Sequence, residues 1–196
     1  TGASSFGKPT AYRPVIDLLR AYFEVYDRGD RQEVRDKIAG YILALDQKLA
    51  SIVPALLSLL DVPVEDPQWQ SLDPRQRRRQ TIDAIKLLLL RESHRQPLCV
   101  VFEDLHWIDS ETQAFLDSLI QSLPAARVLL LVNYRPEYRH EWGSRNYYKQ
   151  LRVDPLPRQN AEEFLRLLLG DGGQLAPLKR LLIEHTGGNP FFLEES

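Results

Sequence analysis

The sequence contains no methionine and a single cysteine, Cys99, among its 196 residues. Because a natural open reading frame starts with methionine, we expect this chain to be a processed product or an excerpt, with a cut at each end. One cysteine excludes an internal disulfide, and its position in an apolar run predicts that it packs in the core.

Long apolar runs and a strong net charge are also missing. No stretch approaches the ~18 apolar residues that indicate a membrane span, and no signal peptide is visible. The formal net charge of -2 argues against a domain that binds nucleic acid. We therefore expect a cytoplasmic protein that has neither a membrane nor a nucleic acid as its partner.

Apolar residues at helical spacing dominate the first half of the chain. Pro54 interrupts the apolar stretch 49–62 and predicts a break or kink there, and the proline-rich stretch 62–74 predicts a loop. Asp73 followed by Pro74 predicts an N-cap and the first turn of the longest helix. The expected helices cover residues 13–25, 31–46 and 74–93.

The apolar pattern changes to short continuous runs in the second half. Residues 97–104 and 126–135 predict two buried strands, and residues 109–124 predict the helix between them, with its cap at Asp109 or Ser110. This order is a βαβ unit, which implies a parallel sheet. A third, shorter strand over 148–156 is followed by helices over 158–170 and 175–188, which end at glycines.

These patterns divide the chain into three expected parts. Residues 1–96 form a mostly helical part, residues 97–154 form the α/β core, and residues 155–196 begin a helical subdomain.

Glu103 and Asp104 directly follow the first predicted strand. The carboxyl end of a parallel strand opens into the crevice where α/β sheets bind ligands. One carboxylate there can hold Mg²⁺, directly or through water, and the other can orient or deprotonate an attacking water. The same spacing is also compatible with two acids that merely mark where a strand leaves the core, so both interpretations stay open.

The first ten residues, TGASSFGKPT, match the start of the phosphate-binding pattern G-x-x-x-x-G-K-S/T through Gly2, Gly7 and Lys8. Pro9 stands where the pattern needs Ser or Thr, and it offers neither a hydroxyl for Mg²⁺ nor an N–H for phosphate. A phosphate-binding loop also needs a preceding strand. We interpret the match as coincidental and not as a working phosphate-binding loop, the Walker A motif.

Several separate segments resemble one family: FGKPTAYRPVIDLLR, RRRQTIDAIKLLLLRES, EDLHWIDSETQAFLDSL, LLLVNYRPEY and HTGGNPFFLEES. They are similar to the STAND ATPases, relatives of the AAA+ P-loop proteins. The likeness is to the ATPase domain found in bacterial class III adenylate or guanylate cyclase proteins and in related multidomain transcriptional regulators. The resemblance implies an α/β fold, a partial P-loop NTPase with a parallel sheet flanked by helices. It would lack the first strand and Walker A and carry a helical lid at the C-terminus.

The resemblance also assigns catalytic roles to three residues. Glu103 and Asp104 match the Walker B acids, which bind Mg²⁺ through water and act in catalysis, although the common order is Asp-Glu. Arg135 matches a sensor arginine that reaches the γ-phosphate, for which a guanidinium is suited by its fixed charge and bidentate geometry. The alternative for Arg135 is a surface arginine in a turn before Pro136.

Three further residues are candidates for contact with the nucleotide. Asn133 could serve the same polar role as Arg135, and Gly188 and Pro190 match the Gly-x-Pro element of the lid, whose proline packs near the base. The alternative for Gly188 and Pro190 is helix punctuation, with glycine ending one helix and proline starting the next.

Other polar and aromatic residues near these candidates have structural interpretations. We expect His106 to be packed or solvated, Trp107 to anchor the core, and Asp109 to cap a helix. The arginines at 75, 77, 78 and 79 form either a solvated or acid-paired face or a contact for phosphate or a partner.

The function that follows is that of an ATP-binding signal-transduction ATPase, a regulatory switch that takes ATP and Mg²⁺ as cofactors. The resemblance implies that the intact protein hydrolyses ATP and carries a covalently attached cyclase-like output domain and a helical repeat region. We expect this fragment to be inactive, because it lacks Walker A. The alternative is a degenerate, non-hydrolysing module for protein interaction.

Overall fold

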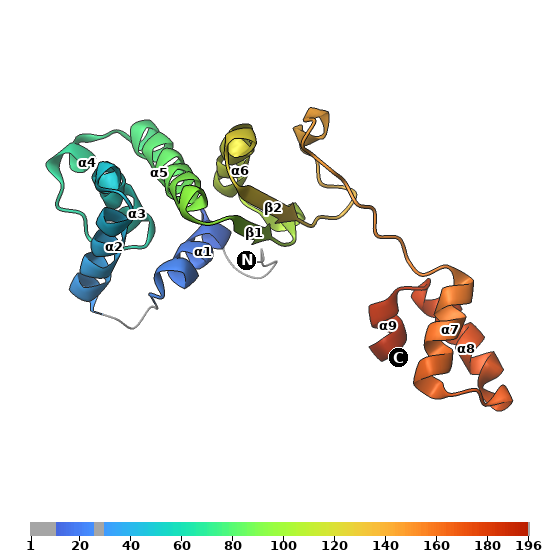
Figure 1. The fold of residues 1–196 in the computed structure, drawn as a ribbon. Coiled ribbons are helices and arrows are strands. Elements are labelled where there is room, and N and C mark those ends of the chain that lie inside the picture. The colour runs from blue at the N-terminus through green and yellow to red at the C-terminus, as the bar shows by residue number, and fades with distance from the viewer. Residues whose placement is uncertain (1–10, 26–29, 196) are drawn as a thin grey trace. The chain divides into compact units, whose positions relative to one another are not determined.

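The computed structural model describes residues 11–25 and 30–195 (Figure 1). The chain divides into two compact units, Thr1–Tyr148 and Lys149–Ser196.

Helices make up most of the first unit, as the apolar periodicity predicts. Pro54 stands in the first turn of α3, where the preceding 3₁₀ turn Gln47–Ile52 gives way to α-helix, so the predicted break is confirmed. The α-helices are α1 (Arg13–Phe23), α2 (Arg31–Leu45), α3 (Val53–Leu59), α4 (Pro67–Ser71), α5 (Pro74–Arg95) and α6 (Ser110–Ser122).

The predicted loop over 62–74 is wrong in part, because it contains the short helix α4. The Asp66 side chain accepts a hydrogen bond from Trp69 N at 2.8 Å, and Pro67 occupies the first turn. The Trp69 side chain is buried against the first unit's core. One cap and one buried aromatic residue thus stabilise a single helical turn.

The cap of α5 is as predicted. Asp73 Oδ1 accepts from Gln76 N at 2.9 Å, and Gln76 Oε1 accepts from Asp73 N at 3.0 Å, which completes a capping box. Pro74 starts the helix.

Two parallel strands, β1 (Leu98–Phe102) and β2 (Val128–Val132), form the sheet (Figure 1). Their register pairs Leu98 with Val128 and Phe102 with Val132, so both strands end at the same edge. Helix α6 lies between them in the chain, and its Phe115 ring lies 6.4 Å from the Phe102 ring. The predicted βαβ unit is confirmed.

The prediction that both strands are fully buried is wrong. Val100 and Phe102 are buried, but Cys99 is exposed, and Leu129 and Leu131 keep 64% and 55% of their surface exposed. Side chains alternate between the two faces of a strand, and the register places Cys99 beside Leu129. Among the described residues, therefore, only one face of the sheet is covered, and the core position expected for Cys99 is on the open face.

The second unit is a small group of helices: α7 (Arg158–Leu169), α8 (Ala176–Thr186) and α9 (Pro190–Glu195). They bury Ala161, Leu165 and Leu193. Gly170 ends α7 at φ 82°, and Gly187 and Gly188 follow α8 at φ 60° and 79°, so the glycine stops are confirmed.

The third strand expected over 148–156 is not formed, and Leu151 and Val153 are almost fully exposed. Pro155 and Pro157 have no backbone N–H to donate to a neighbouring strand, which disfavours pairing here. Within the described ranges, no helix combines the length and apolar character needed to cross a membrane.

Candidate functional site

The two predicted acids lie at the carboxyl edge of the sheet. Glu103 and Asp104 directly follow β1 and are exposed, and Asn133 directly follows the neighbouring strand β2. Because Phe102 pairs with Val132, the acids and Asn133 leave the sheet side by side. The structure thus brings together three of the residues that the sequence proposes, two acids and one carboxamide.

Three hydrogen bonds join Asn133 to the end of β1. Asn133 N donates to Phe102 O at 3.2 Å, and Leu105 N donates to Asn133 O at 3.0 Å. The carboxamide oxygen Asn133 Oδ1 accepts from Asp104 N at 2.7 Å. Asp104 itself has a left-handed backbone, with φ 56° and ψ 46°. We call residues 103–107 the acid turn.

The predicted core position of Trp107 is wrong, since 49% of its surface is exposed. The left-handed Asp104 is followed by the 3₁₀ turn Leu105–Trp107, and Leu105 is the residue of this turn that enters the core. The Arg135 guanidinium carbon lies 6.0 Å from the centroid of the Trp107 ring. Arg135 therefore lies beside the acid turn.

His106 is half-buried beside Trp107, with its ring 5.1 Å from the Trp107 ring. Its two ring nitrogens are buried and have no hydrogen-bond partner among the described residues. The expectation that His106 is packed is confirmed.

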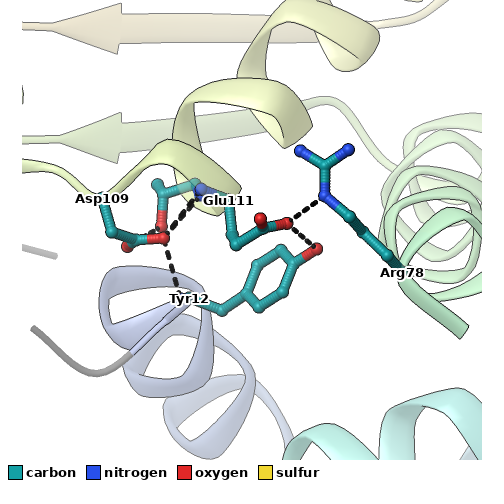
Figure 2. A network of polar contacts seen from close by, with 5 residues as sticks. Tyr12, Arg78, Asp109 and Glu111 are labelled. Atoms are coloured by element: carbon teal, nitrogen blue, oxygen red, sulfur yellow. Dashed lines mark hydrogen bonds and ion pairs between the residues drawn. The ribbon is translucent and has the colours of Figure 1, made fainter. Parts of the chain in front are cut away.

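Asp109 follows the acid turn and caps α6 (Figure 2). Its carboxylate accepts from Glu111 N at 2.9 Å, from Thr112 N at 3.0 Å and from the Thr112 hydroxyl at 2.6 Å. It also accepts from Tyr12 N at 3.1 Å, at the start of α1. Burial by itself raises the pKa of Asp109, but the hydrogen bonds outweigh it and hold the pKa below its usual value.

Glu111 joins α1, α5 and α6 through two contacts on one oxygen (Figure 2). The Tyr12 hydroxyl donates to Glu111 Oε2 at 3.0 Å, and Arg78 Nε donates to the same oxygen at 2.5 Å. Burial, followed by the hydrogen bond to Glu111, raises the pKa of Tyr12. The predicted acid-paired face of the arginine run is confirmed for Arg78, and no local sequence signal pointed to its partner Glu111.

A cluster of aromatic residues follows β2, and the sequence reasoning did not foresee it. Within it, His140 Nε2 lies 2.9 Å from the Tyr134 hydroxyl, and Trp142 N donates to His140 Nδ1 at 3.2 Å. The His140 and Trp142 rings stack with centroids 4.6 Å apart. Burial lowers the pKa of His140, and Asp117 partly offsets this effect. This His140 cluster comprises Tyr134, Tyr138, His140, Trp142 and Tyr148.

Gly188 and Pro190 belong to the second compact unit, whereas the acids belong to the first. A Cβ on Gly188 would lie 2.5 Å from Leu156 O, and Leu156 N donates to Gly188 O at 2.8 Å. Pro190 begins α9. Both residues therefore have a structural reason for their identity. Gly2, Gly7, Lys8 and Pro9 lie outside the described residues.

The donor set at the sheet edge fits Mg²⁺. Across residues 11–25 and 30–195, no group of three His, Cys, Asp or Glu side chains could enclose a metal ion. Mg²⁺ in ATPases does not need such a cage, because it keeps several waters and takes one or two carboxylates together with phosphate oxygens. Glu103 and Asp104 supply two exposed carboxylates of this kind.

Comparison with protein families gives a match. A family model described as an AAA ATPase domain matches residues 1–132. Searches among curated proteins and among solved structures found no match. The matched range includes both acids and ends at the last residue of β2, directly before Asn133.

Proposed function

Because this chain belongs to the AAA ATPase domain family, we propose that it forms part of a nucleotide-dependent regulatory switch that takes ATP with Mg²⁺. AAA ATPase domains generally bind both. The observation that supports this most directly is the pair of exposed carboxylates at the end of β1, fixed to Asn133 at the end of the adjacent strand. This is the edge where parallel sheets bind ligands.

The two acids divide the chemistry between them. One of Glu103 and Asp104 would hold Mg²⁺ through water, and the other would orient or deprotonate the attacking water. Mg²⁺, when bound, neutralises charge on the phosphates of ATP. The acid order is the reverse of the usual one, so the slow turnover of a switch suits this site better than fast hydrolysis.

Arg135 and the lid complete the proposal. The Arg135 guanidinium, exposed and lying over Trp107, is the group that we assign to the γ-phosphate. Gly188 and Pro190 are assigned to a lid near the base. Closure of this lid around nucleotide would bias a neighbouring output domain. We propose that the neighbours are a cyclase-like domain and a helical repeat region, as in the STAND proteins of this type.

The phosphate-binding loop is proposed to lie outside the printed sequence. The only near match, at Gly2 to Pro9, has proline where Mg²⁺ needs a hydroxyl ligand. ATP should therefore bind weakly to this chain and tightly to one extended upstream through Walker A.

A degenerate interaction module is the second candidate, favoured by the open face of the sheet. Exposed Leu129 and Leu131 lie on that face beside Cys99 and Val101. Neighbouring exposed apolar side chains of this kind often mark protein interfaces. In this case the acids would be dispensable for function.

A titration of a fluorescent ATP analogue, with and without Mg²⁺, tests the proposal. It is run on this chain, on the extended chain, and on Glu103→Gln and Asp104→Asn in the extended chain. We expect Mg²⁺-dependent binding by the extended chain, which either acid variant weakens. The matched control is Glu33→Gln, an exposed acid in the first turn of α2. An affinity for the ATP analogue that is the same with and without Mg²⁺, and unchanged in both acid variants, would favour the interaction module.

A further inference from the structure

Asp104 has an unusual backbone at the point where the acids leave the sheet. Of the described residues that are not glycine, only Tyr12, Glu24, Asp61 and Asp104 have positive φ. A left-handed conformation brings Cβ close to the following carbonyl oxygen, and among residues with a side chain Asn and Asp tolerate it best. A partner that hydrogen-bonds to the backbone at Asp104 adds to this preference and selects the conformation in the acid turn.

Two bonds to one residue provide that stabilisation. The bond from Leu105 N ends on the backbone oxygen of Asn133, so any residue at position 133 could accept it. The bond from Asp104 N ends on the side-chain oxygen of Asn133 at 2.7 Å, so it depends on residue identity. Position 133 therefore requires a short side chain with an acceptor oxygen.

The oxygen and the nitrogen of the Asn133 carboxamide thus have different roles. Because Asp104 N is a donor, the atom that faces it must be the oxygen, and the Nδ2 group keeps its two N–H donors. Those donors suit an anionic oxygen, and the acceptor is committed to the protein. A residue that only contacted phosphate would have no need to hold the backbone of the second acid.

We propose that Asn133 is a positioning residue, whose carboxamide oxygen holds Asp104 in the left-handed conformation and so sets the direction of both carboxylates. Rotation about φ and ψ of Asp104 turns the peptide between the β1 end and the 3₁₀ turn, so it changes how the two acids lie relative to Arg135 over Trp107. The purpose of this positioning rests on the proposed nucleotide site. The hydrogen bond from Asp104 N to Asn133 Oδ1, which we call the clamp, can be measured without nucleotide.

The test compares Asn133→Asp, which keeps the acceptor oxygen, with Asn133→Leu, which removes it at similar size. Residue-resolved amide exchange is measured by NMR on the 196-residue chain without nucleotide. We expect the Asp104 amide to exchange about tenfold faster in Asn133→Leu, as for loss of one hydrogen bond, and at nearly the wild-type rate in Asn133→Asp. The amides of α5, which lie outside the acid turn, are the internal control and should be unchanged in both. Asn133→Ala repeats the comparison if Asn133→Leu does not fold.

A rescue variant separates positioning from general damage. Glycine adopts the left-handed region without strain, so Asp104→Gly combined with Asn133→Leu should return the Leu105 and Trp107 amide shifts toward those of Asp104→Gly alone. Equal exchange of the Asp104 amide in wild type and Asn133→Leu, or equally fast exchange in Asn133→Asp and Asn133→Leu, overturns the clamp. Absence of Mg²⁺-dependent ATP binding by the extended chain overturns the proposed function and leaves the exchange result intact.

Discussion

The two compact units differ most in what lies inside them. The first unit surrounds a continuous apolar core in which Phe102, Phe115, Leu116 and Leu119 are fully buried. Among the described residues, the apolar core of the second consists of Ala161, Leu165 and Leu193, and several large apolar side chains are exposed, among them Leu167, Leu181 and Phe191. Units of this small size rarely bury enough surface to be stable without support. We therefore expect the second unit, which carries the proposed lid residues, to unfold more easily than the first, which carries the candidate acids.

The largest expected effect comes from the first core. Phe115→Ala removes a fully buried ring that contacts Phe102 of β1, and it should lower the free energy of unfolding by about 3–5 kcal/mol. Urea denaturation followed by circular dichroism measures the change. The control Phe191→Ala removes an exposed ring and should stay within about 0.5 kcal/mol of wild type.

A core substitution in the second unit should unfold that unit alone. Leu165→Ala empties a position in a core of three buried residues, and typical losses of about 2–5 kcal/mol would match or exceed what so small a unit possesses. We expect amide protection to vanish in α7, α8 and α9 and to persist in α5 and α6. Loss of protection throughout the chain would show instead that the two units unfold together.

Gly188 tests whether the proposed lid element has a backbone requirement of its own. Gly188→Ala places a Cβ 2.5 Å from Leu156 O at a φ of 79°, and strain of about 1–3 kcal/mol should result. The effect should appear in the thermal stability of the second unit. Gly173→Ala is the matched control, because its Cβ meets nothing within 4 Å and its φ is not in the left-handed region. Equal stability of the two variants would contradict the close approach.

Asp109 tests how firmly the polar contacts join α1 to α6 in the first unit. Asp109→Ala removes the cap of α6 and the acceptor for Tyr12 N, with an expected cost of about 1–2 kcal/mol. Asp109→Asn keeps an acceptor oxygen and should cost less. Because the folded-state pKa of Asp109 is lowered, its contribution is present above the unfolded pKa and is lost as pH falls through the folded value. A stability–pH curve in acid that is identical for wild type and Asp109→Asn would contradict this assignment.

Protonation of His140 should give the smallest change in stability, with a direction that its lowered pKa defines. Its folded-state pKa lies below the usual value because the ring is buried, so the unfolded chain binds the proton first. Stability should rise with pH from the folded pKa up to the unfolded pKa of about 6.5 and then level off. Protonation of Nδ1 would also break the bond from Trp142 N. Melting temperatures between pH 5 and 8 should show this rise in wild type and a smaller one in His140→Gln.

Local signals made the starts of α5 and α6 predictable. Asp73 with Pro74, and Asp109 before α6, are caps whose partners in the helix lie within three residues, so the local sequence contains both partners of the capping bond. The acids were likewise found from the end of a strand. Membership in the AAA ATPase domain family supports the ATPase resemblance at that coarser level.

Features that depend on distant partners were not predictable. The position of Trp107 depends on the left-handed turn at Asp104, which a carboxamide 29 residues away stabilises. The exposure of Cys99 depends on which face of the sheet the helices cover. The contact of Arg78 with Glu111 and the His140 cluster need a tertiary arrangement that periodicity does not encode.

Exposed Cys99 gives the molecule a natural attachment point for a reporter. As the only thiol in the chain, it reacts with a maleimide dye at a single place, on the strand that leads into the acid turn. A second cysteine introduced on the exposed surface of α8 then makes a donor and acceptor pair. Energy transfer between the two dyes would report any nucleotide-driven change in the distance between them as a change in the ratio of donor to acceptor emission, in solution and in real time.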